Sequence, residues 1–360
     1  MASETPPPPL RVASVRSALD AVEGPLSGYH HQTYVFPLPA EAGAGLAGRW
    51  KCREPREKLL WFDRRCFESE ERLLYDLQKR IDVIPEVARV SGVDLQRFVE
   101  GSTLSALHPS NRTVPDALFD QIPGLFRQLA AVTASSLPVE RICRPEDRAE
   151  EGDSAGFLEG LVRFVQTQVY EQNLSDYKDL FADLGLQPEA FEYLRERVKG
   201  LRRRPFCLLH ADLHRENLVV DPDGKLWVID WELAMFGDPL YDLATHVYLM
   251  RYPVVQERQL IQRWCRVVEE VRPGSSESWR DDLPRLLDFK KAQSAFTDVI
   301  RASRSLDVEG RFERRRLSPA ARKVWKVLSA AAEPLGLEPV PDPLATEAAL
   351  LRWRDARTRT

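Results

Sequence analysis

The chain has 360 residues, 43% of them hydrophobic, so it can bury a large core, and its length suggests two lobes. A formal net charge of −4 gives no general reason to expect a nucleic-acid or membrane partner, and no apolar run reaches the ~20 residues of a membrane-spanning helix. The five cysteines are scattered, without a C-x-x-C pair, which argues against a disulfide framework and indicates reduced thiols in the cytoplasm.

The region up to residue 100 predicts a tail, strands and two helices. Residues 1–9 hold a tetraproline and no apolar signal segment, so we expect a disordered tail there. Residues 12–22 have an amphipathic pattern that predicts a short helix. Alternating or continuous apolar residues predict strands over residues 32–38, 49–53, 83–90 and 93–99.

One strand and one helix in this region carry charges where burial is expected. Lys51 and Arg53 are two residues apart on a strand, so both side chains lie on one face. Residues 67–78 predict an amphipathic helix, with Glu70 at the centre of its apolar side. A buried carboxylate needs a partner, so we expect Glu70 to pair with the strand cation. The alternative is that Glu70 lies at the edge of this face and reaches water.

After Gly101 the pattern becomes helical. Helices are predicted over residues 117–134, 155–170, 177–184 and 188–201, and again over residues 240–251, 255–272, 283–305 and 318–332. The sequence therefore predicts an α+β protein, with a small antiparallel-sheet lobe followed by a larger, mainly helical lobe.

The stretch from residue 206 to residue 230 places polar residues among short apolar runs. Its second half predicts a hairpin around the Asp-Pro-Asp-Gly turn at residues 221–224. In such a hairpin Asn217 and Asp230 lie at the same open end, and the loop containing Asp212 leads to that end. Three polar groups therefore converge on one small volume.

That volume suits phosphoryl transfer. An acceptor hydroxyl needs a carboxylate that orients it and takes its proton, and Asp212 fits this role. Nucleotide phosphates need Mg²⁺ held by a carboxylate and a neutral amide oxygen, which Asp230 and Asn217 would supply. His210, Asp212 and His214 also form an H-x-D-x-H pattern, but the remaining histidines lack the spacing of zinc ligands. We therefore expect His210 to brace the loop.

These residues resemble those of a known family. H-x-D-x-x-x-x-N over residues 210–217, followed by a strand that ends in Ile-Asp, resembles the aminoglycoside phosphotransferase and choline kinase branch of the protein-kinase-like fold. Gly-Asp-Pro-Leu-Tyr-Asp-Leu-Ala at residues 237–244 is typical of this branch. Ala211 and Trp231 stand where protein kinases usually have Arg and Phe, which favours a small-molecule kinase over a protein kinase.

The resemblance extends from about residue 24 to residue 250 and implies a two-lobed protein-kinase-like fold. Residues 10–100 would form the N-terminal nucleotide-binding lobe, and residues 101–360 the C-terminal catalytic and substrate lobe. The implied reaction is Mg²⁺-dependent transfer of the γ-phosphate of ATP, or of another nucleoside triphosphate, to a hydroxyl of a small molecule. An antibiotic or a related metabolite is the favoured acceptor, in resistance or in biosynthesis.

In the first lobe the resemblance implies a nucleotide site. Lys51 is the favoured phosphate-binding cation and partner of Glu70, whereas the spacing to the following proline would favour Arg53. The other positions with an expected role at the nucleotide are Gly28, His30 and Thr33 in the phosphate loop and Arg97 and Val99 at the interlobe hinge.

The resemblance places the acceptor pocket among the late helices. Residues 301–326 hold nine basic and three acidic residues. If Arg314 and Arg315 line the pocket, they disfavour a polycation and favour a neutral or anionic hydroxylated acceptor; a solvated helix face is the alternative. Glu232 either reaches the metal or substrate or is solvated, and Asp242 is expected to support the catalytic loop.

Other functions stay open at this point. The acceptor is alternatively a primary metabolite, such as a sugar or an amino alcohol, or a peptide. Seven residues separate Asp230 from Asp238, too few for the long regulatory loop of a peptide kinase. A catalytically silent nucleotide-binding protein is the last alternative, and the sequence leaves the oligomeric state open.

Overall fold

The structure is a computed structural model that describes residues 22–26, 31–38, 45–55, 62–90, 92–308 and 311–357. The predicted tail at residues 1–9, almost all of the predicted helix at residues 12–22, and Gly28 and His30 lie outside the described residues. Among the helices that are described, none combines the length and the apolar character needed to cross a membrane.

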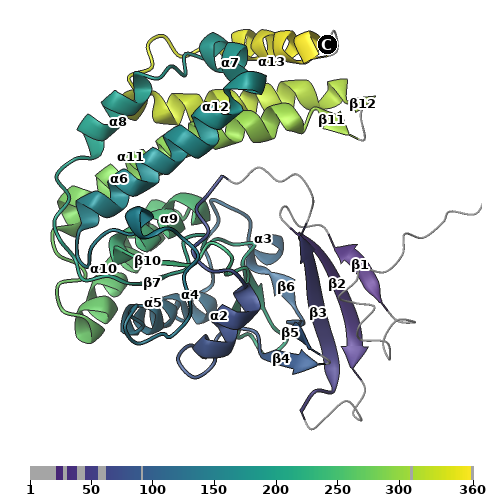
Figure 1. Cartoon of the computed structure of the whole chain (residues 1–360), viewed down its shortest axis with the longest axis vertical. Coiled ribbons are helices and arrows are strands. Elements are labelled where there is room, and N and C mark those ends of the chain that lie inside the picture. The colour runs from purple at the N-terminus through teal and green to yellow at the C-terminus, as the bar shows by residue number, and fades with distance from the viewer. Residues whose placement is uncertain are drawn as a thin grey trace, which may run out of the picture.

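A five-stranded antiparallel sheet forms the first lobe (Figure 1). The strands lie in the order β1-β2-β3-β5-β4, with bounds β1 Glu23–Leu26, β2 His31–Leu38, β3 Gly48–Pro55, β4 Val87–Val90 and β5 Val93–Arg97. The strands predicted over residues 32–38 and 49–53 are confirmed. The strand predicted from residue 83 begins only at Val87, because Pro85 lacks the N–H that a paired strand would use.

The two faces of this sheet differ in character. One face carries an apolar cluster of Phe36, Leu38, Trp50, Cys52 and Leu95. The register of the other face aligns Thr33 with Arg53 and Lys51 with Gln96, so their side chains lie on one side. This polar face meets helix α2 (Glu70–Leu77), because Gln96 donates a 2.9 Å hydrogen bond to Glu70.

Helix α2 begins three residues later than the sequence pattern predicts. Ser69 is its N-cap and accepts a hydrogen bond from the backbone N–H of Arg72 at 3.3 Å. The helix buries Leu73, Leu74 and Leu77, and Glu70 lies among them at 3% exposure. The predicted burial of this carboxylate is therefore confirmed.

The second lobe is built mainly of helices, and its described strands form three small sheets. Its elements are β6 Ser102–Thr103, α3 Leu104–Leu107, α4 Asp116–Phe119, α5 Ile122–Ala131, α6 Ser154–Phe164, the π-helical turn η4 Val165–Tyr170, α7 Leu174–Asp183, α8 Ala190–Val198, β7 Cys207–Leu209, β8 Leu218–Val220, β9 Leu226–Val228, β10 Met235–Gly237, α9 Pro239–Met250, α10 Val254–Val271, α11 Trp279–Arg304, β11 Asp307–Val308, β12 Arg311–Phe312, the short turn η6 Arg314–Arg316, α12 Leu317–Leu335 and α13 Pro343–Arg357. In Figure 1, α6–α8 and α11–α13 form a layer of helices above the region of β7, β10, α5, α9 and α10.

Most predicted helices are found, and one difference has a local cause. The helix predicted over residues 117–134 is divided into α4 and α5, since Pro123 occupies the first turn of a new helix. Helix α13 was not predicted from the sequence.

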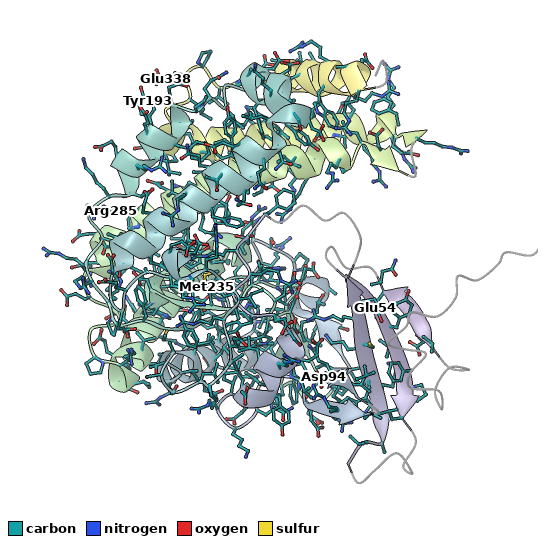
Figure 2. All side chains as sticks on the ribbon, viewed as in Figure 1. Glu54, Asp94, Tyr193, Met235, Arg285 and Glu338 are labelled. Atoms are coloured by element: carbon teal, nitrogen blue, oxygen red, sulfur yellow. The ribbon has the colours of Figure 1, made fainter. Side chains whose placement is uncertain are left out.

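Met235 lies inside the packing in Figure 2, at 2% exposure, whereas Arg285 and Glu338 lie at the outer edge of the helical layer.

Two contacts fix the segments around strands β7 and β8. Gly101 has φ +143°, and a Cβ there would lie 2.1 Å from the carbonyl oxygen of Val220, so only glycine lets the interlobe chain pass against β8. Arg204 is fully buried and forms ion pairs of 2.7 Å with Asp238, the N-cap of α9, and with Asp282 of α11. One guanidinium thereby joins the segment before β7 to both helices.

Candidate active site

The β8–β9 hairpin positions two of the candidate residues. Its register aligns Leu218 with Val228, and the N–H of Ile229 donates to the carbonyl of Asn217 at 3.0 Å. Asn217 and Asp230 therefore lie at the same open end of the hairpin, as the turn predicted.

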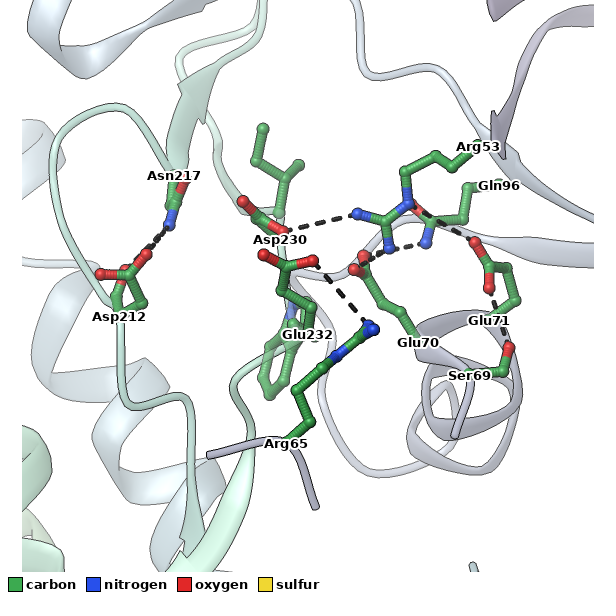
Figure 3. A network of polar contacts seen from close by, with 12 residues as sticks. Arg53, Arg65, Ser69, Glu70, Glu71, Gln96, Asp212, Asn217, Asp230 and Glu232 are labelled. Atoms are coloured by element: carbon green, nitrogen blue, oxygen red, sulfur yellow. Dashed lines mark hydrogen bonds and ion pairs between the residues drawn. The ribbon is translucent and has the colours of Figure 1, made fainter. Parts of the chain in front are cut away.

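The loop before this hairpin places Asp212 against Asn217. The Nδ2 group of Asn217 donates to the backbone carbonyl of Asp212 at 2.9 Å and to its Oδ2 at 3.2 Å (Figure 3). Asp242, on α9, accepts hydrogen bonds from the N–H of His210 at 3.0 Å and of Ala211 at 2.7 Å. Ala211 has φ +63°, a left-handed conformation that these bonds help to hold.

Asp242 makes the stability of this loop depend on pH. Burial raises its pKa to about 6 and outweighs the two backbone hydrogen bonds that favour the carboxylate. The folded chain therefore keeps a proton that the unfolded chain releases near pH 3.8, so this group stabilises the fold less as the pH rises from about 4 to about 6.

Asp242→Asn should remove this pH-dependent loss. We expect the free energy of unfolding of the variant, relative to the parent, to rise across that window by up to about 3 kcal/mol, at ~1.4 kcal/mol per pKa unit. Urea unfolding at pH 4 to 7 measures the difference. Asp223→Asn, at an exposed turn, is the control and should give a flat difference. A flat difference for Asp242→Asn would contradict the assignment.

Two histidines flank Asp212 with opposite properties. Burial lowers the pKa of His210 to about 4, so the ring is neutral, and its Nε2 contacts the carbonyl of Ile229 at 3.1 Å. Its Nδ1 accepts from the N–H of Asp212 at 3.3 Å, so this side chain braces the loop. His214 lies 3.3 Å from Oδ2 of Asp212; burial opposes its charge, but the hydrogen bond and charge of Asp212 outweigh burial and raise its pKa. The sequence did not reveal the contact of His214.

Asp230 lies in the most acidic part of the site. Burial and the nearby carboxylates of Glu70 and Glu232 raise its pKa to about 7, while Arg53, at 3.4 Å, opposes the rise. Its φ of +66° turns the chain immediately after the hairpin. The strongly raised pKa marks a position where a bound cation would stabilise the carboxylate.

The strand cation that pairs with Glu70 is Arg53, whereas the sequence favoured Lys51. Arg53 forms an ion pair with Glu70, lies 3.6 Å from Glu71, and reaches Asp230 as well (Figure 3). Lys51 shares this face of β3, and burial together with the charge of Arg53 lowers its pKa. The forked guanidinium of Arg53 reaches both Glu70 and Asp230. Among the described ion pairs, Lys51 reaches neither.

The remaining predicted positions are more scattered. Thr33 faces Arg53 across β2 and β3. Arg97 stacks on Trp50 at 4.5 Å and donates to Gly45 and Ala47 carbonyls, so its side chain braces the sheet lobe, and Val99 is half-buried two residues later. The solvated alternative for Glu232 is wrong, because the residue is 6% exposed and lies 3.9 Å from Arg65.

The two predicted acceptor arginines lie on the surface of the helical lobe. Arg314 and Arg315 are exposed in η6, and Arg315 pairs with Glu313 at 2.9 Å. Among the described contacts, neither arginine is bonded to Asp212 or to its partners.

A second group of charges near Asp212 was missed by sequence reasoning. Lys290 of α11 donates to Gln293 at 2.7 Å, and Gln293 donates to Asp63. Lys290 and Asp63 both lie within electrostatic range of Asp212, and Asp63 also interacts with Arg301. The only sequence signal was the three-residue spacing of Lys290 and Gln293, which puts both on one helix face.

The donor set at the hairpin end fits a magnesium ion in complex with a nucleotide. No cluster of three His, Cys, Asp or Glu side chains in the described ranges is arranged to hold a metal by itself. Asn217 uses its NH₂ group on Asp212, which leaves its amide oxygen for a hard cation, and Asp230 supplies a carboxylate. Mg²⁺ bound to nucleotide phosphates keeps few protein ligands, so two suffice.

Comparisons with known proteins place the chain in a family. Residues 66–274, more than half of the chain, match the family model described as the phosphotransferase enzyme family. A choline kinase from Streptococcus pneumoniae is similar in structure, with a TM-score of 0.52 and 17% identity over 89% of this chain and 96% of that one. A choline/ethanolamine kinase family protein from Mesorhizobium loti gives a TM-score of 0.50 and 17% identity over 91% and 92% of the two chains.

Two further similarities complete the comparison. The structure of a gentamicin-APH(2″)-IIa complex gives a TM-score of 0.53 and 15% identity, covering 88% of this chain and 93% of that one. Acyl-CoA dehydrogenase family member 11 of Mus musculus is 37% identical over 71 residues, which are 19% of this chain but only 8% of that protein. The structural similarities confirm the predicted two-lobed α+β fold.

Proposed function

Because the chain belongs to the phosphotransferase enzyme family, and because the structures similar to it include choline and choline/ethanolamine kinases, we propose that it transfers the γ-phosphate of ATP, with Mg²⁺, to a hydroxyl of a small molecule. The observation that supports this most is the convergence of Asp212, Asn217 and Asp230 opposite the Arg53–Glu70 ion pair (Figure 3). A carboxylate for the acceptor and hard oxygen donors for the phosphates thereby lie together at one end of the β8–β9 hairpin.

Asp212 is the proposed catalytic base. Its Oδ2 accepts from Asn217 and lies beside His214, so both neighbours hold the carboxylate in one orientation. The backbone of the same loop is held by Asp242 and His210. Asp212 would accept the proton of the acceptor hydroxyl as that oxygen attacks phosphorus.

Asn217 and Asp230 would hold Mg²⁺. When bound, this ion neutralises the charge that develops on the phosphate oxygens. Asp230 also receives an ion pair from Arg53, so this carboxylate connects the hairpin to the sheet lobe.

Arg53 is the proposed phosphate-binding cation of the sheet lobe. Arg53→Gln should lower kcat/KM for ATP by about 10–100-fold, because a charge-assisted hydrogen bond contributes roughly 1.5–3 kcal/mol. Steady-state kinetics with varied ATP measure this. Lys51→Gln, on the same face of the same strand, is the matched control and should change kcat/KM by less than about 3-fold. The reverse order would return the role to Lys51.

The proposed acceptor is a hydroxylated metabolite or antibiotic that is not a polycation. Lys290 and Arg301 place positive charge near Asp63, beside the catalytic loop, which disfavours a highly cationic ligand. Arg314 and Arg315 remain proposed contributors to the positive electrostatic field at the acceptor. Reversing both charges should then change the acceptor KM and its salt dependence but not the KM for ATP.

An acceptor panel tests the proposed function. Purified protein with Mg²⁺ and ATP would be assayed for ADP release and, by mass spectrometry, for a phosphorylated product. The panel holds nucleoside antibiotics, macrolides, sugars, choline, ethanolamine and kanamycin. We expect product with a neutral acceptor and none with kanamycin. Kanamycin turnover would overturn the acceptor class alone, whereas ATP binding without any product would favour a silent nucleotide-binding protein.

A further inference from the structure

Two cysteines that lie far apart in the sequence are in contact away from the Asp212 cluster. Cys66 precedes α2, and Cys143 lies between α5 and α6. The N–H of Ile142 donates to the carbonyl of Cys66 at 2.9 Å, and Phe67 and Arg141 form an antiparallel bridge. The two segments therefore run at strand spacing, about 5 Å apart, which brings both cysteines to the lining of one cavity.

The two thiols have different environments. Cys66 is 4% exposed, and its pKa is raised because it donates to Cys143 and is buried. The hydrogen bond from Cys66 and the nearby Arg148 lower the pKa of Cys143 to about 6, against the effect of burial. At neutral pH the more exposed sulfur is therefore the thiolate, which is the nucleophilic form.

Cys143 borders two cavities. One, of about 170 Å³, is lined by both cysteines together with Arg64, Arg141 and Arg148. The other, of about 430 Å³, is lined by Cys143 and Arg64 among others. Asp147 also lines both cavities, but arginines outnumber the acidic residues in each lining. Cys143 is only half-buried, unlike Cys52 and Cys207, so a small oxidant can reach its thiolate from these cavities.

We propose that Cys66 and Cys143 form a redox modification site that closes to a reversible disulfide on exposure to a peroxide. The Cys143 thiolate attacks hydrogen peroxide, the O–O bond breaks, and the departing hydroxide takes up a proton to leave as water. Cys66 then loses its proton and attacks the resulting sulfenic acid, so that the S–S bond forms and a second water leaves. Two thiols are oxidised and one peroxide is reduced.

The position of this pair links it to the phosphotransfer site. The residues after Cys66 carry Glu70, which pairs with Arg53, and Arg65, before it, approaches Glu232. A disulfide would tie this segment to the loop that contains Cys143. The proposal concerns thiol chemistry and does not depend on the proposed phosphotransferase activity.

Peptide mapping of the oxidised protein tests the proposal directly. The full-length protein would be treated with hydrogen peroxide, denatured, alkylated without reduction and digested with trypsin. Cleavage predicts one cross-linked species joining residues 66–72 to residues 142–148, because a proline blocks cleavage after Arg144. We expect this species, the loss of two of the five alkylatable thiols, and recovery of both with dithiothreitol.

The controls separate this pair from general oxidation. Cys143→Ser should abolish the paired thiol loss, whereas Cys265→Ser should leave it unchanged, because burial raises the pKa of the half-exposed Cys265 to about 11. Conversion of Cys143 to sulfinic or sulfonic acid without the cross-link would overturn the proposal. So would oxidation of Cys265 before Cys143. The wild-type peptide map decides the question even if a variant fails to fold.

Discussion

Asp212→Asn is expected to lower kcat by about 10²–10⁴-fold, the usual contribution of a general base. The asparagine keeps the shape of the side chain and can still accept from Asn217, but it cannot take the proton of the acceptor hydroxyl. The KM for ATP should change little, because other residues are proposed to hold the phosphates. Steady-state kinetics with the acceptor found in the panel, together with ATP binding by calorimetry, would measure both effects.

Glu216→Gln provides the matched control for this variant. Glu216 belongs to the same loop but is exposed, so its kcat should stay within about 2-fold of the parent. If Asp212→Asn instead weakened ATP binding and left turnover near normal, Asp212 would have to be reassigned from the acceptor to the nucleotide.

Asp230→Asn is expected to raise the Mg²⁺ concentration required for half-maximal activity by at least about 10-fold and to lower kcat, because a hard cation loses a charged oxygen ligand. The same change should stabilise the protein at pH 8 without ligands. Burial and neighbouring carboxylates raise the pKa of Asp230 from 3.8 to about 7, so stability is lost as the pH rises from about 4 to about 7, and the whole loss is present at pH 8; asparagine does not ionise.

This prediction is specific because Asp230→Asn should lower the activity of the protein and raise its stability. Thermal unfolding at pH 8 should show a higher midpoint for Asp230→Asn, and the difference should shrink progressively as the pH falls from about 7 to about 4. Asp223→Asn, at the far turn of the hairpin, should change neither quantity. An unchanged Mg²⁺ titration would remove Asp230 from the metal site.

The β8–β9 hairpin was predictable because neighbouring residues in the sequence determine its pairing. The Asp-Pro-Asp-Gly turn sets the pairing of β8 with β9, and pairing alone brings Asn217 and Asp230 to one end. Burial of Glu70 was predictable for the same reason, since helical periodicity places it among Leu73, Leu74 and Leu77.

Neighbouring residues in the sequence could not decide whether Lys51 or Arg53 pairs with Glu70. Both cations lie on one face of β3, and the pairing depends on how far α2 and the hairpin stand from that strand. The same holds for Lys290 and Asp63, which both lie near the loop that carries Asp212 although they are more than two hundred positions apart in the sequence. Such contacts depend on the distance between packed elements and on the length of the side chains that cross it. The order of residues along the chain does not reveal that distance.

The ion pairs of Arg204 limit how this protein can acquire new specificity. Arg204 joins Asp238, at the start of the helix that carries Asp242, to Asp282, on the helix that carries Lys290 and Gln293. Sliding α11 to enlarge the proposed acceptor side would break a buried ion pair, which costs about 3–5 kcal/mol, and would disturb the anchor of the loop that carries Asp212. Divergence toward other acceptors should therefore proceed by side-chain replacement along α11, with the helix itself staying in register.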